Sequence, residues 1–203
     1  MALSRTEVIN AALLAIGVRP IADPDERSEA AYRAKDVYNT VVRSELEKYP
    51  WFFAKRAVRL AASATAPLLH YERAFLLPTD FIRLVELEDR WVFDVLRGTP
   101  NVDPIPTYVV TDRYVHSDFA APLGISYIAD LTEDPPLWTP LFTRAVTYAL
   151  AEALAFPLTK SDGVTERMSR LYDKAVTAAR RSSAMQQPTQ HVPDGSWLAS
   201  RRS

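Results

Sequence analysis

The side chains that could carry chemistry are few and lie far apart in the sequence. The three histidines, His70, His116 and His191, have no spacing typical of metal ligands, and no phosphate-binding, nucleophile-elbow or zinc-protease motif occurs. The carboxylates in residues 23–26 cluster where a helix N-terminus would stabilise them in any case. The sequence therefore predicts a protein that is not an enzyme and that needs no cofactor and no metal.

Basic residues next to aromatic ones raise the alternative of nucleic-acid binding. Lys55, Arg56 and Arg59 follow the aromatic run 51–53. We expect the aromatic rings to close a helix against the core and the basic side chains to lie on the exposed side. Two alternatives stay open. One is a DNA-binding packaging protein that would use the basic residues of the last helix, and the other is a hydrolase whose acid pair forms only in the folded chain.

The first fifty residues carry the patterns of two helices. Ser4 and Glu7 have the spacing of a capping box, an apolar stripe at helical period follows, and Gly17 ends the pattern. Residues 23–26 repeat a start signal, with a capping aspartate, a proline and a carboxylate. We therefore expect the second helix to begin there and to end near residues 49–50.

The segment 51–136 changes to short β-type runs separated by proline and glycine, which is typical of an antiparallel sheet or a small sandwich. The loops 97–106 and 117–124 are expected to be exposed. The expected strands are residues 57–62, 74–77, 82–87, 91–96, 107–111 and 125–129.

Helices return after residue 136. Thr139 offers a cap and Pro140 follows it, and the helix that starts there is apolar nearly all round, which indicates a buried central helix. We expect Pro157 to end this helix. A last helix with one apolar face and several basic residues runs to about Gln187. Residues 188–203 have a composition that cannot pack by itself, which predicts disorder in the free protein.

Charge is distributed unevenly, although the net charge is only −1. Residues 137–203 contain nine Lys and Arg against five Asp and Glu, a sum of +4, so residues 1–136 sum to −5. An acidic body with a basic C-terminal part is not the footprint of a protein that grips DNA. The chain contains no cysteine, and neither a secretory signal nor an uninterrupted apolar run of about 20 residues is evident. We expect a protein that folds in the cytosol and does not contact a membrane.

Six short motifs follow one another along nearly the whole chain. They are residues 49–54 with Trp51-Phe52-Phe53-Ala54, residues 74–83 with Leu77-Pro78-Thr79-Asp80 and Arg83, residues 125–128, residues 136–142 around Trp138, residues 154–159 and residues 195–198. In this order they resemble the tail tubular protein A family of short-tailed phages and related head-to-tail adaptors, including those of gene transfer agents. Thr139 stands where the family has an aspartate, and it still offers a capping side chain.

The resemblance implies an α+β fold and a structural function in a virion. The expected fold is a four-helix bundle with an inserted antiparallel β-sheet or sandwich domain and a disordered C-terminal tail. The boundaries are 1–50 and 137–187 for the helices of the bundle, 51–136 for the β domain and 188–203 for the tail. The implied assembly is a homo-oligomeric ring of about twelve copies at the head–tail junction, built in the host cytoplasm.

The implied partners are the portal protein on one face of this ring and the next tail, stopper or nozzle protein on the other. DNA passes through the lumen without specific binding. A tail-completion or stopper protein one step further down the neck stays open as an alternative.

The tail supplies the predicted portal-binding residues. An exposed tryptophan is costly in water, and tryptophan and arginine are enriched among the residues that dominate binding energy. We expect Trp197 to fill a portal pocket and the arginines to fix the register. If the tail is dispensable, the last helix becomes the docking element. The full set of predicted portal-binding residues is Trp197, Leu198, Arg201, Arg202, Arg180 and Arg181.

Overall fold

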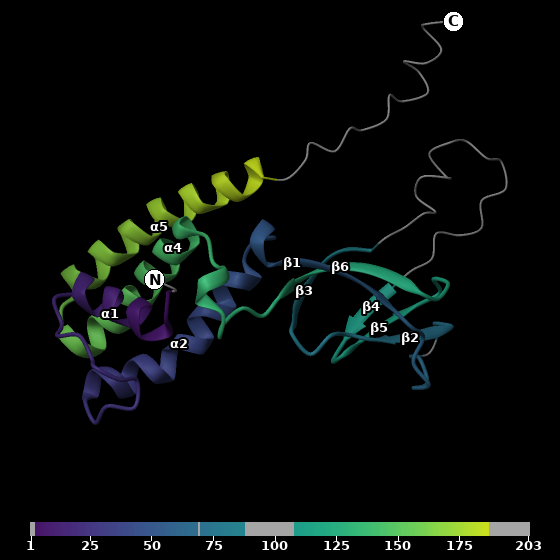
Figure 1. Ribbon diagram of the computed structural model, residues 1–203, viewed down its shortest axis with the longest axis horizontal. Coiled ribbons are helices and arrows are strands. Elements are labelled where there is room, and N and C mark those ends of the chain that lie inside the picture. Colours follow the sequence, from purple (N-terminus) through teal and green to yellow (C-terminus); the bar gives the residue numbers. More distant parts are fainter. Residues whose placement is uncertain (1–2, 69, 88–107, 187–203) are drawn as a thin grey trace, which may run out of the picture.

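The computed structural model describes residues 3–68, 70–87 and 108–186, and within them the chain combines helices and sheets. Four α-helices and two small antiparallel sheets are present among these residues. The helices gather at one end of the molecule and the strands at the other (Figure 1). The α+β class predicted from the sequence is confirmed.

The first helix has the ends that its sequence predicts. α1 (Arg5–Ala15) begins at the capping box: the Ser4 hydroxyl accepts from the Glu7 backbone N–H at 3.2 Å, and Glu7 Oε2 accepts from the Ser4 N–H at 2.7 Å. The chain leaves the helix through Gly17, whose φ of +78° is a conformation that glycine adopts without strain.

The second helix begins later than the sequence predicted. α2 (Glu29–Glu47) starts at the N-cap Ser28, whose hydroxyl accepts from the Ala31 N–H. The expected start signal at residues 23–26 forms a separate turn, in which Asp23 Oδ1 accepts from the Asp25 N–H and Glu26 Oε2 accepts from the Ala22 N–H. The start prediction was wrong because these capping side chains satisfy backbone donors of a loop rather than those of a helix.

The two C-terminal helices follow the strands. α4 (Pro140–Thr159) is capped by the Thr139 hydroxyl, as predicted. The expectation that Pro157 ends α4 was wrong, because the helix continues to Thr159 and Lys160 closes the last turn with an N–H bond to Phe156 O at 2.9 Å. A proline this close to the end removes a single helical hydrogen bond. α5 (Asp162–Met185) follows directly.

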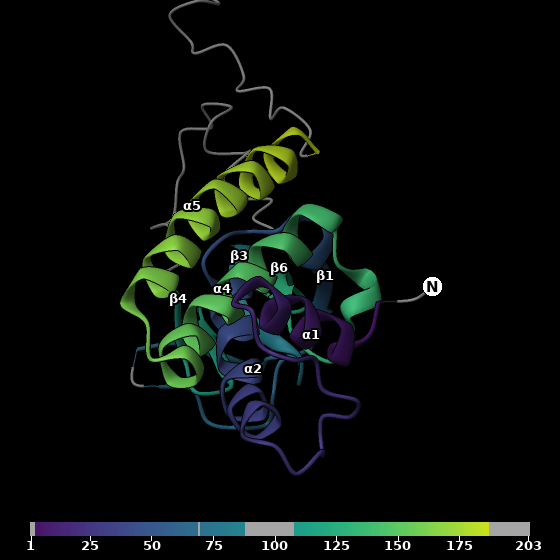
Figure 2. The same cartoon turned by 90° about the vertical axis from the view of Figure 1, so that its left-hand side faces the viewer.

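α4 is the central helix of this group. It contacts α1, α2 and α5 (Figure 2), and its inward side chains, among them Phe142, Leu150 and Leu154, are at most 1% exposed. By length and mean hydropathy (1.2) α4 could also span a membrane, but the core helix of a folded domain meets the same criterion. The packing on three neighbouring helices is that of a core helix.

The strands form two three-stranded sheets in the described residues. The first sheet has the order β1-β6-β3, with β1 (Lys55–Leu60), β6 (Leu123–Ala129) and β3 (Phe81–Leu87). The second has the order β2-β5-β4, with β2 (Arg73–Leu76), β5 (Tyr114–Ser117) and β4 (Tyr108–Thr111). An isolated bridge between Ala62 and Phe75 joins the end of β1 to β2. Buried residues of the helices and of both sheets belong to one continuous apolar core.

Five of the six predicted strands coincide with observed ones to within a few residues, and the sixth, residues 91–96, lies outside the described residues. β5 was not predicted. Its four residues carry His116 and Ser117, which are buried polar side chains and break the apolar pattern that marks a strand. The predicted loop 117–124 is shortened at both ends by β5 and β6, while the predicted loop 97–106 lies outside the described residues.

Candidate functional site

The predicted docking residues divide between two parts of the chain. Arg180 and Arg181 lie near the C-terminal end of α5, so this end is the part of the predicted site that the structure describes. The other four fall outside the described residues: Trp197, Leu198, Arg201 and Arg202.

Helical spacing turns one face of α5 onto α4. Its buried side chains recur three, four and seven residues apart, and Leu171 and Tyr172 pack beside them as partly buried neighbours. This is the face that the sequence predicted, and Ser183 extends it toward the helix end. The buried residues are Met168, Ala175, Val176, Ala179 and Ser183.

The structure separates the two adjacent arginines. Arg180 is half-buried, and its guanidinium lies 5.9 Å from the centre of the Tyr49 ring. Its Nε is buried and has no hydrogen-bond partner in the structure. Arg181 is exposed and lies about 100° further round the helix. Arg180 therefore packs against the body of the protein, and Arg181 is the one that can reach a partner.

A hydrogen bond fixes the end of α5 to the short 3₁₀ helix η1 (Phe52–Ala54). The Ser183 hydroxyl accepts from the Phe52 backbone N–H at 2.9 Å. Phe52 itself is 45% exposed and Met185 is 87% exposed, so apolar side chains remain at the surface on either side of this contact.

A buried carboxylate joins α5 to α2. Glu45 is 2% exposed, and both of its oxygens lie 3.0 Å from the Tyr172 hydroxyl. Lys48 Nζ donates to Glu45 Oε1 and to the Tyr172 oxygen. Burial raises the pKa of Tyr172, with the carboxylate of Glu45 adding to the rise. Partial burial lowers the pKa of Lys48, but its hydrogen bonds and the charge of Glu45 outweigh this and raise it overall.

The first motif of the resemblance lies beside this carboxylate. Trp51 is fully buried, and its Nε1 donates to the backbone oxygen of Glu45 at 2.7 Å. Its ring packs 4.9 Å from that of Phe142 on α4, and Trp138 packs on the same ring at 5.3 Å. The prediction that the aromatic run closes the helix against the core is confirmed for Trp51, whereas Phe52 points to the surface.

The second motif links strands of the first sheet to one another and, through Arg83, to α2. Asp80 Oδ1 accepts from the Tyr127 hydroxyl at 3.0 Å, and Asp80 Oδ2 forms an ion pair with Arg56 at 2.6 Å. Burial and the bond to Asp80 raise the pKa of Tyr127. Arg83 donates to the backbone oxygen of Glu47 at the end of α2 at 2.8 Å. Arg56, which the sequence predicted as an exposed basic side chain, therefore links β1 to the residue that precedes β3.

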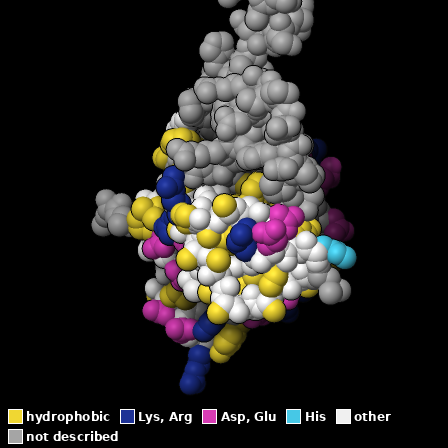
Figure 3. All heavy atoms as spheres, turned by 90° about the vertical axis from the view of Figure 1, so that its right-hand side faces the viewer, with side chains coloured by type: hydrophobic (Ala, Val, Ile, Leu, Met, Phe, Trp, Pro, Cys, Tyr) yellow, Lys and Arg dark blue, Asp and Glu magenta, His cyan; other side chains and the backbone are white. Residues whose placement is uncertain are grey.

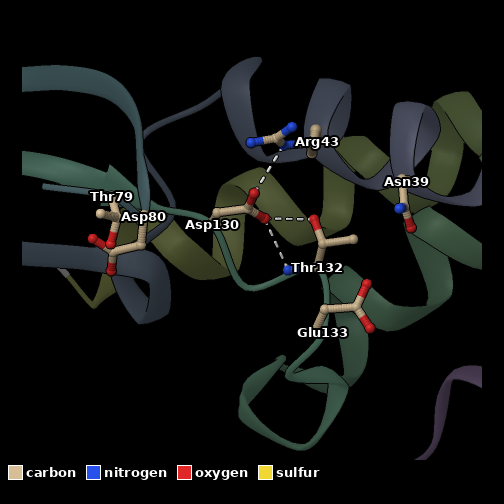
Figure 4. Close-up of a pocket in the computed structure, with 7 residues that line it drawn as sticks. All are labelled: Asn39, Arg43, Thr79, Asp80, Asp130, Thr132 and Glu133. Carbon is tan, nitrogen blue, oxygen red and sulfur yellow. Dashed lines mark hydrogen bonds and ion pairs between the residues drawn. The ribbon is translucent and has the colours of Figure 1, made fainter. Parts of the chain in front are cut away.

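A pocket of about 340 Å³ opens at this joint (Figure 4). Asp130 points toward Arg43 and Thr132, with an ion pair of 2.8 Å to the former and two hydrogen bonds from the latter. Asp80 and Glu133 also line the pocket, so the fold brings together three acids that the sequence did not relate. Asp80 and Asp130 each accept from an arginine and from a hydroxyl, and Glu133 lies 3.6 Å from Arg5, an arrangement typical of structural ion pairs.

The described residues contain no group of three or more histidine, cysteine, aspartate or glutamate side chains placed to hold a metal. His116 is buried and its Nδ1 accepts from the Leu68 N–H at 3.2 Å, so it acts as a packing residue of β5. His70 lies in a turn at φ 96°, and His191 falls outside the described residues.

A scan against models of protein families finds no match to this chain, and a search of curated proteins finds no match either. The motif residues, and their positions in the fold, therefore carry the evidence for function.

Proposed function

We propose that this chain is a head-to-tail adaptor of a phage-like particle, a structural virion protein that joins the portal to the tail. In this proposal the four helices form a bundle around α4, and the two sheets form an inserted sandwich-like domain. About twelve copies assemble into a ring at the head–tail junction, and DNA leaves the head through its lumen.

The observation that carries the proposal is the position of the motif residues. Trp51 and Trp138 both pack on Phe142 at the start of α4, Arg83 ties the first sheet to the end of α2, and Asp80 ties β1 and β6 of that sheet together. Residues of four of the six motifs, those at 49–54, 74–83, 125–128 and 136–142, therefore also make contacts between elements of this fold. Because motif residues of this kind determine how the helices and strands pack on one another, their presence supports the same architecture in this chain as in the family it resembles.

Exposed apolar side chains support contacts between subunits. The strand end presents a surface on which apolar groups lie scattered among polar ones (Figure 3). Single exposed apolar residues are ordinary on a monomer, and exposed large apolar residues lie at both ends of the molecule, so in this proposal those at the strand end form one part of the ring interface. At the strand end the exposed large apolar residues are Leu68, Leu76, Tyr108 and Val110.

The portal contact is assigned to the C-terminal region. Trp197 and Leu198 are the only large apolar residues among residues 194–203, and Arg201 and Arg202 follow them closely. A rigid aromatic anchor with neighbouring cations suits a partner pocket rimmed by carboxylates.

The experiment is co-elution of the purified chain with portal rings encoded in the same genome. Formation of a complex supports an adaptor. Binding to the next neck protein but not to the portal would instead favour the stopper alternative.

A further inference from the structure

The outward face of α5 carries three cations and one long apolar side chain in a single row. Arg170, Lys174, Arg181 and Met185 are all exposed and recur at intervals of four, seven and four residues. At roughly 100° per residue these intervals place the four side chains within an arc of about 60°. We call these four residues the α5 ridge.

The α5 ridge has few internal partners. Arg170 has a 3.6 Å ion pair with Glu166, and both side chains are about two-thirds exposed, so water screens the pair. Neither Lys174 nor Arg181 takes part in an ion pair within the described part of the chain. α5 packs on α4 and η1 through its opposite face.

The charge of this helix is also unlike that of the other long surface helix. α5 contains five basic residues against three acidic ones, and two of the acids, Asp162 and Glu166, lie near its N-terminal end. The described α2, by contrast, mixes both signs along its length, with ion pairs such as Arg33 to Glu29. A solvated helix face usually mixes signs as α2 does, whereas a face of one sign favours a partner of the opposite sign.

We propose that the α5 ridge is a docking surface for an acidic protein face, with the three cations meeting carboxylates and Met185 filling an apolar contact at the helix end. The inference rests on the proposed function and identifies the portal protein as the partner that carries the acidic face. It extends the predicted docking region from the tail to the body of the chain. It also replaces Arg180, which packs on Tyr49, by residues that face outward.

The test measures the affinity of portal rings for three forms of the full-length chain by biolayer interferometry in 0.15 M salt. One variant reverses the ridge charges with Arg170→Glu, Lys174→Glu and Arg181→Glu. The matched control makes the same change in charge at three exposed arginines outside α5, with Arg19→Glu, Arg27→Glu and Arg113→Glu. A fourth form, the single substitution Arg181→Ala, serves if the triple variant does not fold.

The ridge variant is expected to bind the portal roughly tenfold more weakly or worse, and the control within about twofold of wild type. Equal binding by the ridge variant and wild type would overturn the inference and leave the adaptor function standing. An equal loss in ridge variant and control would also overturn it, because net charge alone would then be the cause. Failure of wild type to bind the portal removes both proposals.

A parallel titration with duplex DNA covers the other class of acidic partner. If reversal of the ridge abolishes a salt-sensitive DNA affinity and leaves portal binding unchanged, the ridge is a nucleic-acid surface and the proposal is wrong.

Discussion

The hydroxyl of Tyr172 on α5 lies 3.0 Å from both carboxylate oxygens of Glu45 on α2, two residues that are separated by 127 positions in the sequence. Glu45 is buried, so the tyrosine and Lys48 replace the water that a carboxylate would otherwise bind. The contact holds the helix that carries the predicted docking end against the rest of the protein.

Replacement of Tyr172 by phenylalanine should lower the free energy of unfolding by roughly 1–3 kcal/mol, because a buried carboxylate loses a donor. Urea unfolding measures the change. Tyr32→Phe is the control, since the Tyr32 side chain is 58% exposed and its loss of a hydroxyl should cost little. Equal stability of the Tyr172 variant and wild type would show that the contact does not hold α5.

Truncation of α4 core residues should cost far more than truncation of its surface. Leu150→Ala or Leu154→Ala should lower the free energy of unfolding by roughly 2–5 kcal/mol through lost burial and a residual cavity. Phe156→Ala on the same helix is the control, because Phe156 is 50% exposed. Unchanged melting temperatures for both leucine variants would contradict a central position of α4.

The starts of α1 and α4 and the buried faces of α4 and α5 could be predicted from the sequence because their causes are local. The capping box of Ser4 and Glu7 and the cap at Thr139 use residues within three positions of one another. The same capping chemistry at Asp23 led to the wrong predicted start for α2, because the sequence does not distinguish a side chain that caps a turn from one that caps a helix.

The contacts between helices and strands that lie far apart in the chain could not be predicted from the sequence. Glu45 reads as a surface residue of an amphipathic helix, and only its distant partner Tyr172 explains its burial. Asp80 and Asp130 come together in one pocket because β3 and β6 pair, and no local pattern encodes that pairing. Arg180 and Arg181 look equivalent in sequence, and the path of α5 against Tyr49 separates them.

Alkaline pH should weaken the fold through Tyr38. Burial raises the pKa of its hydroxyl from 10.0 to about 12, so the folded state keeps the proton more tightly than the unfolded state. The stabilisation is complete below pH 10 and is lost as the pH rises toward 12, by roughly 2–3 kcal/mol in total. Chemical unfolding of wild type and Tyr38→Phe between pH 9 and 12 measures it, and the slope with pH should be smaller in the variant. Identical slopes would contradict the assignment.

Removal of the tail should weaken portal binding more than any single tail substitution does. A chain that ends after Gln187 should bind portal rings at least tenfold more weakly than wild type, and Trp197→Ala should account for much of that loss, at roughly 2 kcal/mol or more. Titration of immobilised portal rings measures both. If the truncated chain binds as tightly as wild type, the tail is not the docking element, and the α5 ridge must carry the contact alone.

The most direct test of the adaptor function is the stoichiometry of the chain on its portal. Mass photometry of portal rings with excess chain should give one saturated complex. Its added mass should correspond to about twelve copies of the 22.8 kDa chain, and negative-stain images should show an extra ring on one face of the portal. Monomers alone at saturating portal concentration, with no added ring, would contradict the account.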